Sequence, residues 1–201
     1  MPGGTIAIID SGGANIASLL YAFERLGARA GLTTDPGEIR GASRVVLPGV
    51  GAARDAMDRL RDQGLVDVIR NLTQPVLGIC LGMQLLADAS EEDDVDCLGI
   101  VPGTAQRLAS SAGCPVPNMG WCSITKTGRH DVLRSTQDGS YFYFLHSYAL
   151  PVSNCTIATA VHAEPFSAVV QKDNFVAAQF HPERSSQNGA RLLSRFVGIE
   201  R

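Results

Sequence analysis

The stretch of residues 75–89 constrains the fold more than any other part of the chain. It begins with an apolar run, reaches a single cysteine at Cys80, and continues into a helix-forming run over residues 83–89. Gly78 and Gly82 flank the cysteine two residues away on each side. Glycine at this spacing predicts a buried strand, a sharp turn and the start of a helix, because a tight turn leaves no room for Cβ atoms.

The thiol at the apex of this turn has two interpretations. A cysteine beside a helix start is favoured as the thiolate, the reactive form, and the backbone N–H of Leu81 would point toward an oxyanion. The serine version of such a turn is the nucleophile elbow of hydrolases. Cysteine is also among the residue types most often buried for packing alone. The turn by itself leaves both interpretations open.

Apolar, β-prone runs alternate with helical patterns through the first eighty residues. This alternation predicts a doubly wound, mainly parallel sheet of the α/β class. In such sheets the functional groups gather at the carboxyl ends of the strands, where Asp10, the loop 48–51 and Cys80 would meet. The expected strands are 5–9, 28–33, 44–47 and 76–79, and the expected helices are 15–26, 52–63 and 65–72.

The second half of the chain has a different sequence pattern, in which β-prone runs dominate. Its β-prone runs predict an antiparallel extension of the sheet, with a hairpin turn at residues 172–174. The acidic residues 91–96 are expected to form a solvated surface loop. The expected strands are 140–145, 156–161, 168–171 and 175–180, followed by a last helix over 189–197.

Length and composition exclude several classes of function. The 201 residues, 45% of them hydrophobic, suit one domain over residues 1–201. The net charge of −3 and the lack of a basic patch argue against nucleic acid and anionic membranes. No signal peptide and no apolar run of about 20 residues is found. The five cysteines contain no C-x-x-C pair, which predicts no metal site and favours a reducing cytoplasm.

A catalytic thiol needs a base, and two histidines that follow β-prone runs are candidates, His146 and His181. His181 begins the sequence His181-Pro182-Glu183. Proline holds the preceding residue in extended geometry, and residues i and i+2 of an extended chain point the same way. The Glu183 carboxylate can therefore orient the His181 imidazole and favour its charged form. This pattern favours a Cys80–His181–Glu183 triad, although a strand-end histidine with a surface glutamate remains an alternative.

Residues 78–84 and 179–183 together resemble the motifs of the class I (triad) glutamine amidotransferases. The resemblance implies a flavodoxin-like fold and hydrolysis of L-glutamine through a thioester on Cys80, without a cofactor. His181 would be the general base and acid, and Glu183 its orienting partner. The matching substrate contacts are Gln84, Ser147 and Tyr148.

Residues 48–51, 99–103, 118–121 and 144–148 resemble the glutaminase subunits of imidazole glycerol phosphate synthases. The resemblance implies a heterodimer with a (β/α)8-barrel synthase (cyclase) subunit. That subunit would use the ammonia to form imidazole glycerol phosphate and AICAR in histidine biosynthesis. The implied oxyanion residues are Gly49, Val50, Gly51 and Leu81, and the implied interface residues are Asn15, Trp121 and Arg184.

Three positions depart from the subunit pattern, and other functions stay open. Ser11 stands where an aromatic residue is usual, Asn118 where histidine is frequent, and Cys122 where asparagine is usual. The alternatives are an amidotransferase subunit of purine, anthranilate or pyridoxal phosphate synthesis, a stand-alone cysteine hydrolase, and a non-catalytic binding domain. Intact Cys80, His181 and Glu183 weigh against the last.

Overall fold

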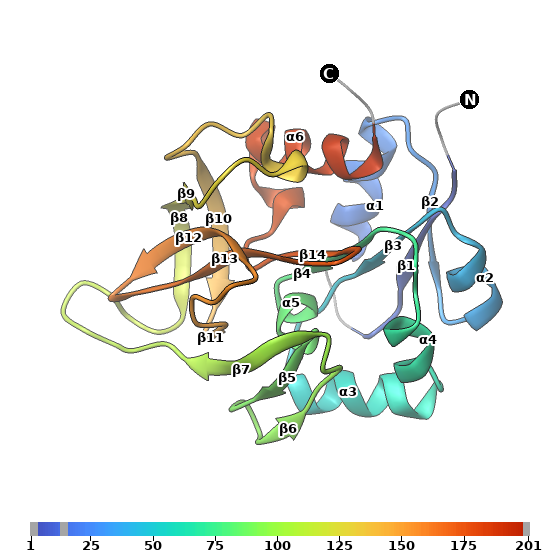
Figure 1. The fold of residues 1–201 in the computed structure, drawn as a ribbon, viewed down its shortest axis with the longest axis horizontal. Helices are drawn as coiled ribbons and strands as arrows, with labels where there is room; N and C mark the ends of the chain where they lie inside the picture. Colours follow the sequence, from blue (N-terminus) through green and yellow to red (C-terminus); the bar gives the residue numbers. More distant parts are fainter. Residues whose placement is uncertain (1–3, 13–15, 199–201) are drawn as a thin grey trace.

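An eight-stranded, mainly parallel sheet forms the centre of the molecule in a computed structural model that describes residues 4–12 and 16–198 (Figure 1). The strand order is β2-β1-β3-β4-β14-β13-β12-β9. The first five strands are mutually parallel, and the remaining pairs are antiparallel. The strands are β1 (Ile6–Ile9), β2 (Ala30–Thr33), β3 (Arg44–Leu47), β4 (Val76–Ile79), β9 (Thr125–Lys126), β12 (Thr156–His162), β13 (Glu164–Lys172) and β14 (Phe175–Ala178).

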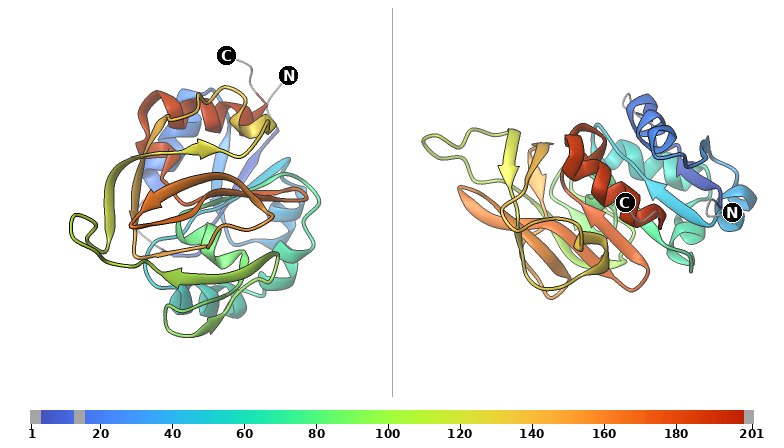
Figure 2. Two further views of the ribbon diagram at one scale, coloured as in Figure 1. Left: turned by 60° about the vertical axis from the view of Figure 1, so that its left-hand side comes forward. Right: turned by 90° about the horizontal axis from the view of Figure 1, so that it is seen from above.

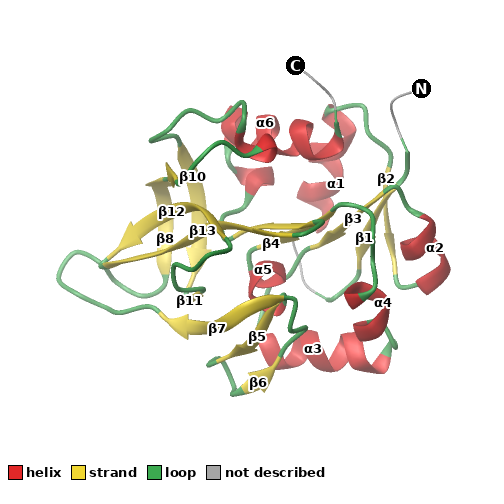
Figure 3. Cartoon of the chain, in the orientation of Figure 1, coloured by secondary structure: helices red, strands yellow, loops and turns green. Residues whose placement is uncertain are grey.

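Helices cover both faces of this sheet, so its central strands are apolar throughout (Figure 3). On one face α1 (Ile16–Arg25) and α6 (Ser186–Val197) pack in one core cluster with Leu77 and Ile79. The opposite face carries α2 (Pro36–Gly41), α3 (Ala53–Asp62), α4 (Val66–Arg70) and α5 (Leu81–Leu85). The alternation predicted for the first eighty residues is confirmed.

Two smaller sheets stand beside the main one. One pairs β8 (Asn118–Ser123) with β10 (Tyr141–His146) antiparallel. The other has the order β11-β7-β5-β6, and its β5–β7 pair is parallel. Its strands are β5 (Ala87–Ser90), β6 (Val95–Asp96), β7 (Val101–Arg107) and β11 (Tyr148–Ala149). The short helices η1 (Asp131–Leu133) and η2 (Pro182–Arg184) complete the described elements.

The hairpin turn predicted at residues 172–174 joins β13 to β14 antiparallel, as expected. The strand β14 then pairs parallel with β4 on its other side. The last strand of the chain therefore enters the parallel half of the sheet and ends beside Cys80. This placement brings the motif at residues 179–183 to the carboxyl end of β4.

The helix expected over residues 83–89 was wrong at its far end. The helix α5 starts at Leu81 and stops at Leu85, and residues 87–90 form β5. Pairing with β6 and β7 gives these backbone groups ladder partners, and this tertiary pairing outweighs their local helix propensity.

The acidic segment was also only partly a solvated loop. Val95 and Asp96 pair as β6, and the Glu92 carboxylate accepts the Ala53 N–H at 2.9 Å, at the start of α3. The Arg54 guanidinium contacts the carbonyl of Asp93. The segment therefore docks on the N-terminus of α3, where a carboxylate complements the free N–H groups.

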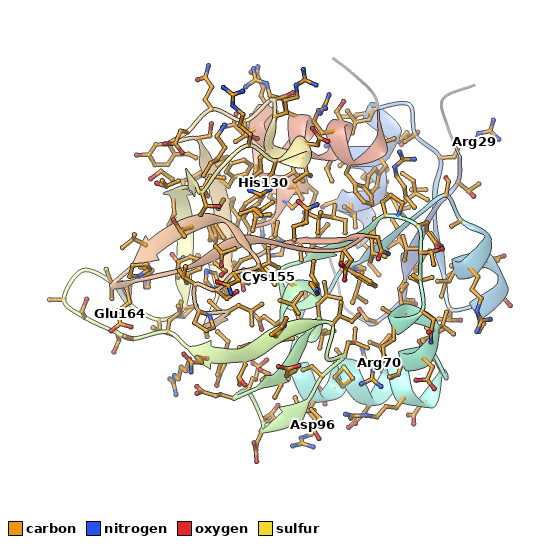
Figure 4. All side chains as sticks on the ribbon, in the orientation of Figure 1. Arg29, Arg70, Asp96, His130, Cys155 and Glu164 are labelled. Carbon is orange, nitrogen blue, oxygen red and sulfur yellow. The ribbon has the colours of Figure 1, made fainter. Side chains whose placement is uncertain are left out.

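One loop extends from the periphery of the molecule. The connection between β7 and β8 projects away from the body of the molecule in the further views (Figure 2). Charged side chains such as Arg29, Asp96 and Glu164 lie at the outer edge (Figure 4). Within residues 4–12 and 16–198, no helix is long and apolar enough to cross a membrane.

Candidate active site

Cys80 occupies the strained turn between β4 and α5. Its backbone has φ 53° and ψ −111°, and the residue is buried. A Cβ atom on Gly82 would overlap the carbonyl oxygen of Leu47, and one on Gly78 would lie 2.9 Å from the Ala177 Cβ. The glycines are thus required by close backbone approach, as their spacing predicted.

His181 and Glu183 lie side by side at the end of β14. The His181 backbone is extended, with φ −97° and ψ 98°, as expected before proline, but the expected extended chain beyond it was wrong, because Pro182–Arg184 form the 3-10 helix η2. The Nδ1 atom of His181 lies 2.9 Å from the Glu183 Oε1, with both side chains buried. Cys80 and the imidazole line the same cavity, and the interaction with Cys80 is one of those that raise the pKa of His181. The structure therefore brings the three predicted triad residues into one row.

His181 is charged at neutral pH despite its burial. Burial lowers the pKa of His181, but its hydrogen bonds to Cys80 and Glu183, and the charges of those groups, raise the pKa to about 10. An imidazolium next to the thiol favours the thiolate form. The row from Cys80 to Glu183 can therefore supply a nucleophile and, from the imidazolium, a proton.

His146, the competing candidate, is committed elsewhere. Its Nδ1 lies 2.9 Å from the Tyr148 carbonyl, and its Nε2 lies 3.0 Å from the Asn118 amide nitrogen. Burial lowers the pKa of His146 to about 4, helped by the charges of His162 and His181 and opposed by the bond to Tyr148. A neutral imidazole that donates to Tyr148 and accepts from Asn118 satisfies both contacts. The site thus assigns His146 to holding the pocket wall.

A cavity of about 370 Å³ opens in front of the thiol, a size suited to a small ligand. Nine of the residues singled out in the sequence line it, together with Glu92, Pro117, Leu145 and His146. The nine are Val50, Gly51, Cys80, Leu81, Gln84, Ser147, Tyr148, His181 and Arg184. Gly49 and Glu183 instead line a second cavity of about 20 Å³ beneath the loop 48–51.

The loop 48–51 lies directly against the turn that carries Cys80. A Cβ atom on Gly49 would come within 2.9 Å of the Leu81 Cβ and 3.0 Å of the Gly82 nitrogen. Gly51 has φ 95°, in the region that favours glycine. Val50 borders both cavities, so this loop separates them.

Gln179 is a site residue that sequence reasoning missed. It is fully buried, and its Nε2 lies 3.8 Å from the Cys80 Sγ. The Gln84 amide donates to the Gln179 Oε1 at 3.2 Å and to the Tyr148 carbonyl at 2.8 Å. The signal was available, because Gln179 belongs to the same short motif, residues 179–183, as His181 and Glu183.

Glu92 is a second missed residue, and its local sequence carried no signal beyond acidity. Its carboxylate lines the cavity near Gln84 while it accepts the Ala53 N–H. Burial raises the pKa of Glu92, and so does the charge of Asp93, whereas the Ala53 hydrogen bond lowers it. Within the described part of the chain, no cluster of three or more metal-ligating side chains is present.

The predicted interface residues Trp121 and Arg184 lie on one exposed surface. Trp121 is 51% exposed, and Met119 and Tyr141 on the same pair of strands are also exposed. The Arg184 guanidinium lies 4.4 Å from the centre of the Tyr143 ring, which meets the Trp121 ring edge-on at 6.1 Å. We call Met119, Trp121, Tyr141, Tyr143 and Arg184 the aromatic face. Asn15 lies outside the described residues.

Comparisons with known proteins agree on a family. Residues 7–199 match the model of the family described as glutamine amidotransferase class-I. The chain is 49% identical over 195 residues to the imidazole glycerol phosphate synthase subunit HisH 2 of Legionella pneumophila strain Philadelphia 1, covering 97% of this chain and 98% of the relative. It is 48% identical over 192 residues to the HisH subunit of Xanthomonas axonopodis pv. citri, covering 96% of each.

Solved structures show the same fold at low sequence identity. A glutamine amidotransferase matches with a TM-score of 0.73 at 17% identity, covering 96% of this chain and 97% of that one. PurLQS from Thermotoga maritima matches with a TM-score of 0.71 at 15% identity and the same coverage. The predicted flavodoxin-like, mainly parallel architecture is thereby confirmed.

Proposed function

Because the chain belongs to the class I glutamine amidotransferases, and within them to the family of the HisH subunits, we propose that it hydrolyses L-glutamine through a thioester on Cys80 and delivers the ammonia to a synthase subunit. The observation that carries the proposal is the grouping of Cys80, His181 and Glu183 beside the main cavity, in which a hydrogen bond of 2.9 Å joins His181 to Glu183. In this proposal, residues 1–201 act as one glutaminase domain in the cytoplasm, where a reducing environment keeps thiols free.

The reaction proceeds in two steps with His181 as the proton carrier. The Cys80 thiolate attacks the side-chain amide carbon of glutamine, and the His181 imidazolium protonates the departing nitrogen, which leaves as ammonia. The neutral imidazole then takes a proton from water, which attacks the thioester and releases glutamate. Glu183 keeps the imidazole oriented through both steps by its 2.9 Å hydrogen bond.

The oxyanion of each tetrahedral intermediate needs N–H donors. The backbone N–H of Leu81 is one donor in this proposal, and an N–H of Gly49, Val50 or Gly51 is the second. Removing one such donor costs about 10²–10³ in rate in other enzymes. Rotation of a peptide group in the loop 48–51 can therefore act as a switch, and we propose that the synthase subunit sets it.

The ends of the cavity suit the two charges on the glutamine backbone. Gln84 and the backbone of Ser147 and Tyr148 offer polar contacts at one wall. The Glu92 carboxylate lies on the same cavity and complements an α-ammonium group. Glutamine placed between these contacts has its amide directed toward Cys80.

The aromatic face is the proposed docking surface for a (β/α)8-barrel synthase subunit. Exposed aromatic residues and arginine are the residue types that dominate binding energy at interfaces. Arg184 belongs to the aromatic face and also lines the main cavity, so the docking surface adjoins the place where ammonia forms. A heterodimer formed here would receive ammonia without exposing it to solvent, for the synthesis of imidazole glycerol phosphate and AICAR in histidine biosynthesis.

The test replaces Cys80 and measures synthesis with either glutamine or added ammonium as the nitrogen source. In the complex, Cys80→Ala should lose glutamine-dependent synthesis by about 10⁴-fold or more. Synthesis from added ammonium should remain at the wild-type rate, because the synthase site is untouched. Full glutamine-dependent activity in a folded Cys80→Ala complex would disprove the assignment of the nucleophile.

A stand-alone cysteine hydrolase is the second candidate, because the same row of side chains serves many acyl transfers. It predicts fast turnover of γ-glutamyl peptides by the isolated chain. Turnover of free glutamine that rises on addition of the synthase subunit, without turnover of such peptides, separates the two. An amidotransferase of another pathway would respond to a different synthase subunit.

A further inference from the structure

Ser11, which departs from the subunit pattern, is tied to the loop 48–51. The residue follows β1 and is 2% exposed. Its hydroxyl donates to the Pro48 carbonyl at 2.8 Å, a contact between positions 37 residues apart. Pro48 is the first residue of the loop, so this bond joins the first and third loops at the carboxyl edge of the sheet.

Hydrogen bonds hold the backbone around Ser11 in place. The Ser11 N–H donates to the Ile9 carbonyl at 3.1 Å, and the Ser11 carbonyl accepts from Arg59 of α3 at 3.5 Å. Gln63, just after α3, donates to the Asp10 carbonyl at 3.4 Å. Contacts with β1 and with α3 and its C-terminal flank therefore position the segment that carries the Ser11 hydroxyl.

The bond divides the loop into a held part and a free part. The Pro48–Gly49 peptide cannot rotate without breaking the bond to Ser11, and Gly49 is also wedged against Leu81. Among the described residues, no hydrogen bond is made by the backbone groups of Gly49, Val50 and Gly51. Their peptides keep the freedom that the Pro48–Gly49 peptide has lost.

The small cavity offers space for the carbonyl group of a rotated peptide in the loop 48–51. Its volume of about 20 Å³ is sufficient for about one water-sized group, such as a carbonyl oxygen. Pro48, Gly49 and Val50 line it, and Cys80 does not. A carbonyl turned into this cavity leaves the N–H of the same peptide on the side of the main cavity, since the two groups of a trans peptide point in opposite directions.

We infer that Ser11 is a positioning residue for the oxyanion loop, whose hydroxyl locks the Pro48–Gly49 peptide and confines rotation to the Gly49–Val50 and Val50–Gly51 peptides. The inference rests on the proposed function, because it assigns Ser11 a part in stabilising the oxyanion formed at Cys80. Ser11 itself touches neither the thiol nor the main cavity.

The test compares Ser11→Ala with Ser11→Thr, which keeps the hydroxyl. Loss of one hydrogen bond should lower kcat for glutamine about 3- to 10-fold, both in the isolated chain and with the synthase subunit. The KM for glutamine should stay unchanged, and Ser11→Thr should stay within about twofold of wild type in kcat. Alkylation of Cys80 by iodoacetamide should keep its wild-type rate, because displacement at a methylene carbon forms no oxyanion.

Ser167→Ala is the matched control. The Ser167 hydroxyl is buried and also donates to a proline carbonyl, that of Pro151, at 2.8 Å. It should cost stability and leave kcat unchanged. An unchanged kcat in Ser11→Ala would overturn the inference, and so would a parallel loss of kcat and of iodoacetamide labelling, the sign of a purely structural role. If Ser11→Thr does not fold, the kcat values of Ser11→Ala and Ser167→Ala are compared instead, and only that of Ser11→Ala should be lowered.

The inference and the proposed function fail in different experiments. Hydrolysis that survives Cys80→Ala would defeat the proposed function, a result that no Ser11 variant can produce.

Discussion

His181 is buried yet carries a positive charge, because Cys80 and Glu183 flank it. Burial alone would keep the imidazole neutral, and the interactions with Cys80 and Glu183 reverse that preference. The raised pKa means that this interaction stabilises the fold fully below the unfolded value of about 6.5 and is lost as pH rises through about 10. In the proposed mechanism the same charge supplies the proton for the departing ammonia.

Glu183→Gln tests this arrangement. Loss of the carboxylate charge lowers the pKa of His181, so the alkaline limb of kcat/KM should move to lower pH. The rate at neutral pH should fall by less than in Cys80→Ala, since orienting residues cost less than nucleophiles. A pH–rate profile between about pH 6 and 11 measures both effects. An alkaline limb at the wild-type position would contradict the role of Glu183.

The pKa of His146 predicts the opposite pH dependence of stability from that of His181. Its pKa, lowered mainly by burial to about 4, keeps it neutral in the folded chain while the unfolded chain binds a proton below about 6.5. Stability is therefore complete above about pH 6.5 and is lost as pH falls toward 4. Between about pH 7 and pH 4.5 this amounts to about 2 kcal/mol.

Urea unfolding of wild type and His146→Gln at both pH values isolates this contribution. The variant should lose about 2 kcal/mol less than wild type on acidification, because a glutamine at this position does not titrate. His181 does not affect the comparison, because wild type and variant both contain it and its contribution cancels in the difference. Equal acid losses in the two proteins would show that His146 is not the group concerned.

At the scale of elements, the turn from β4 to α5 depends on contact with β3. The Leu47 carbonyl at the end of β3 occupies the space where a side chain on Gly82 would begin. The loop 48–51 then continues from β3 across the turn. Thus the nucleophile and the oxyanion loop are positioned by one backbone contact between neighbouring parallel strands.

Gly82→Ala should separate β3 from this turn. Overpacking of this kind costs about 1–3 kcal/mol of unfolding free energy, and glutamine hydrolysis should fall together with stability. Gly31→Ala is the control, because a Cβ atom on Gly31 would meet nothing within 4 Å beyond its own chain neighbours. Thermal unfolding and glutaminase rates of both variants check the prediction. A Gly82→Ala protein as stable and active as Gly31→Ala would refute it.

At the scale of the whole molecule, the same strands contribute to the main cavity and to the aromatic face. The strands β8 and β10 present Trp121 and Tyr141 outward, while His146 at the end of β10 faces the cavity. Arg184 borders both. In the proposed complex, docking of the synthase subunit on the aromatic face would therefore act on the wall of the main cavity.

Trp121→Ala should weaken binding of the synthase subunit by about 2–4 kcal/mol, the range of central aromatic residues at interfaces. The stability of the isolated chain should change little, because the ring is half exposed. Val161→Ala, on the exposed end of β12, is the control and should bind normally. Titration calorimetry with the synthase subunit gives both values. Normal binding by Trp121→Ala would place the interface elsewhere.

The sequence alone determined the strand–turn–helix around Cys80, the alternation of the first half and the pairing of His181 with Glu183. The first two rest on rules that act within a few residues, which are glycine at a tight turn and the periods of helix and strand. The pairing of His181 with Glu183 was predicted correctly from their separation of two residues, but it is made through the 3-10 helix η2 and not through an extended chain. The identity of the fold followed because such local rules agreed along the chain.

Only the tertiary structure decided what depends on distant pairing. Residues 87–90 became strand β5 because β6 and β7 offered ladder partners, and β14 reached Cys80 because it paired with β4. The sequence already favoured His181, but only the structure shows that Tyr148 and Asn118 occupy both nitrogens of the other candidate, His146. Glu92 entered the cavity through contact with α3, 39 residues away. Contacts of this range leave no periodic trace in a sequence, because only the packed chain brings the partners together.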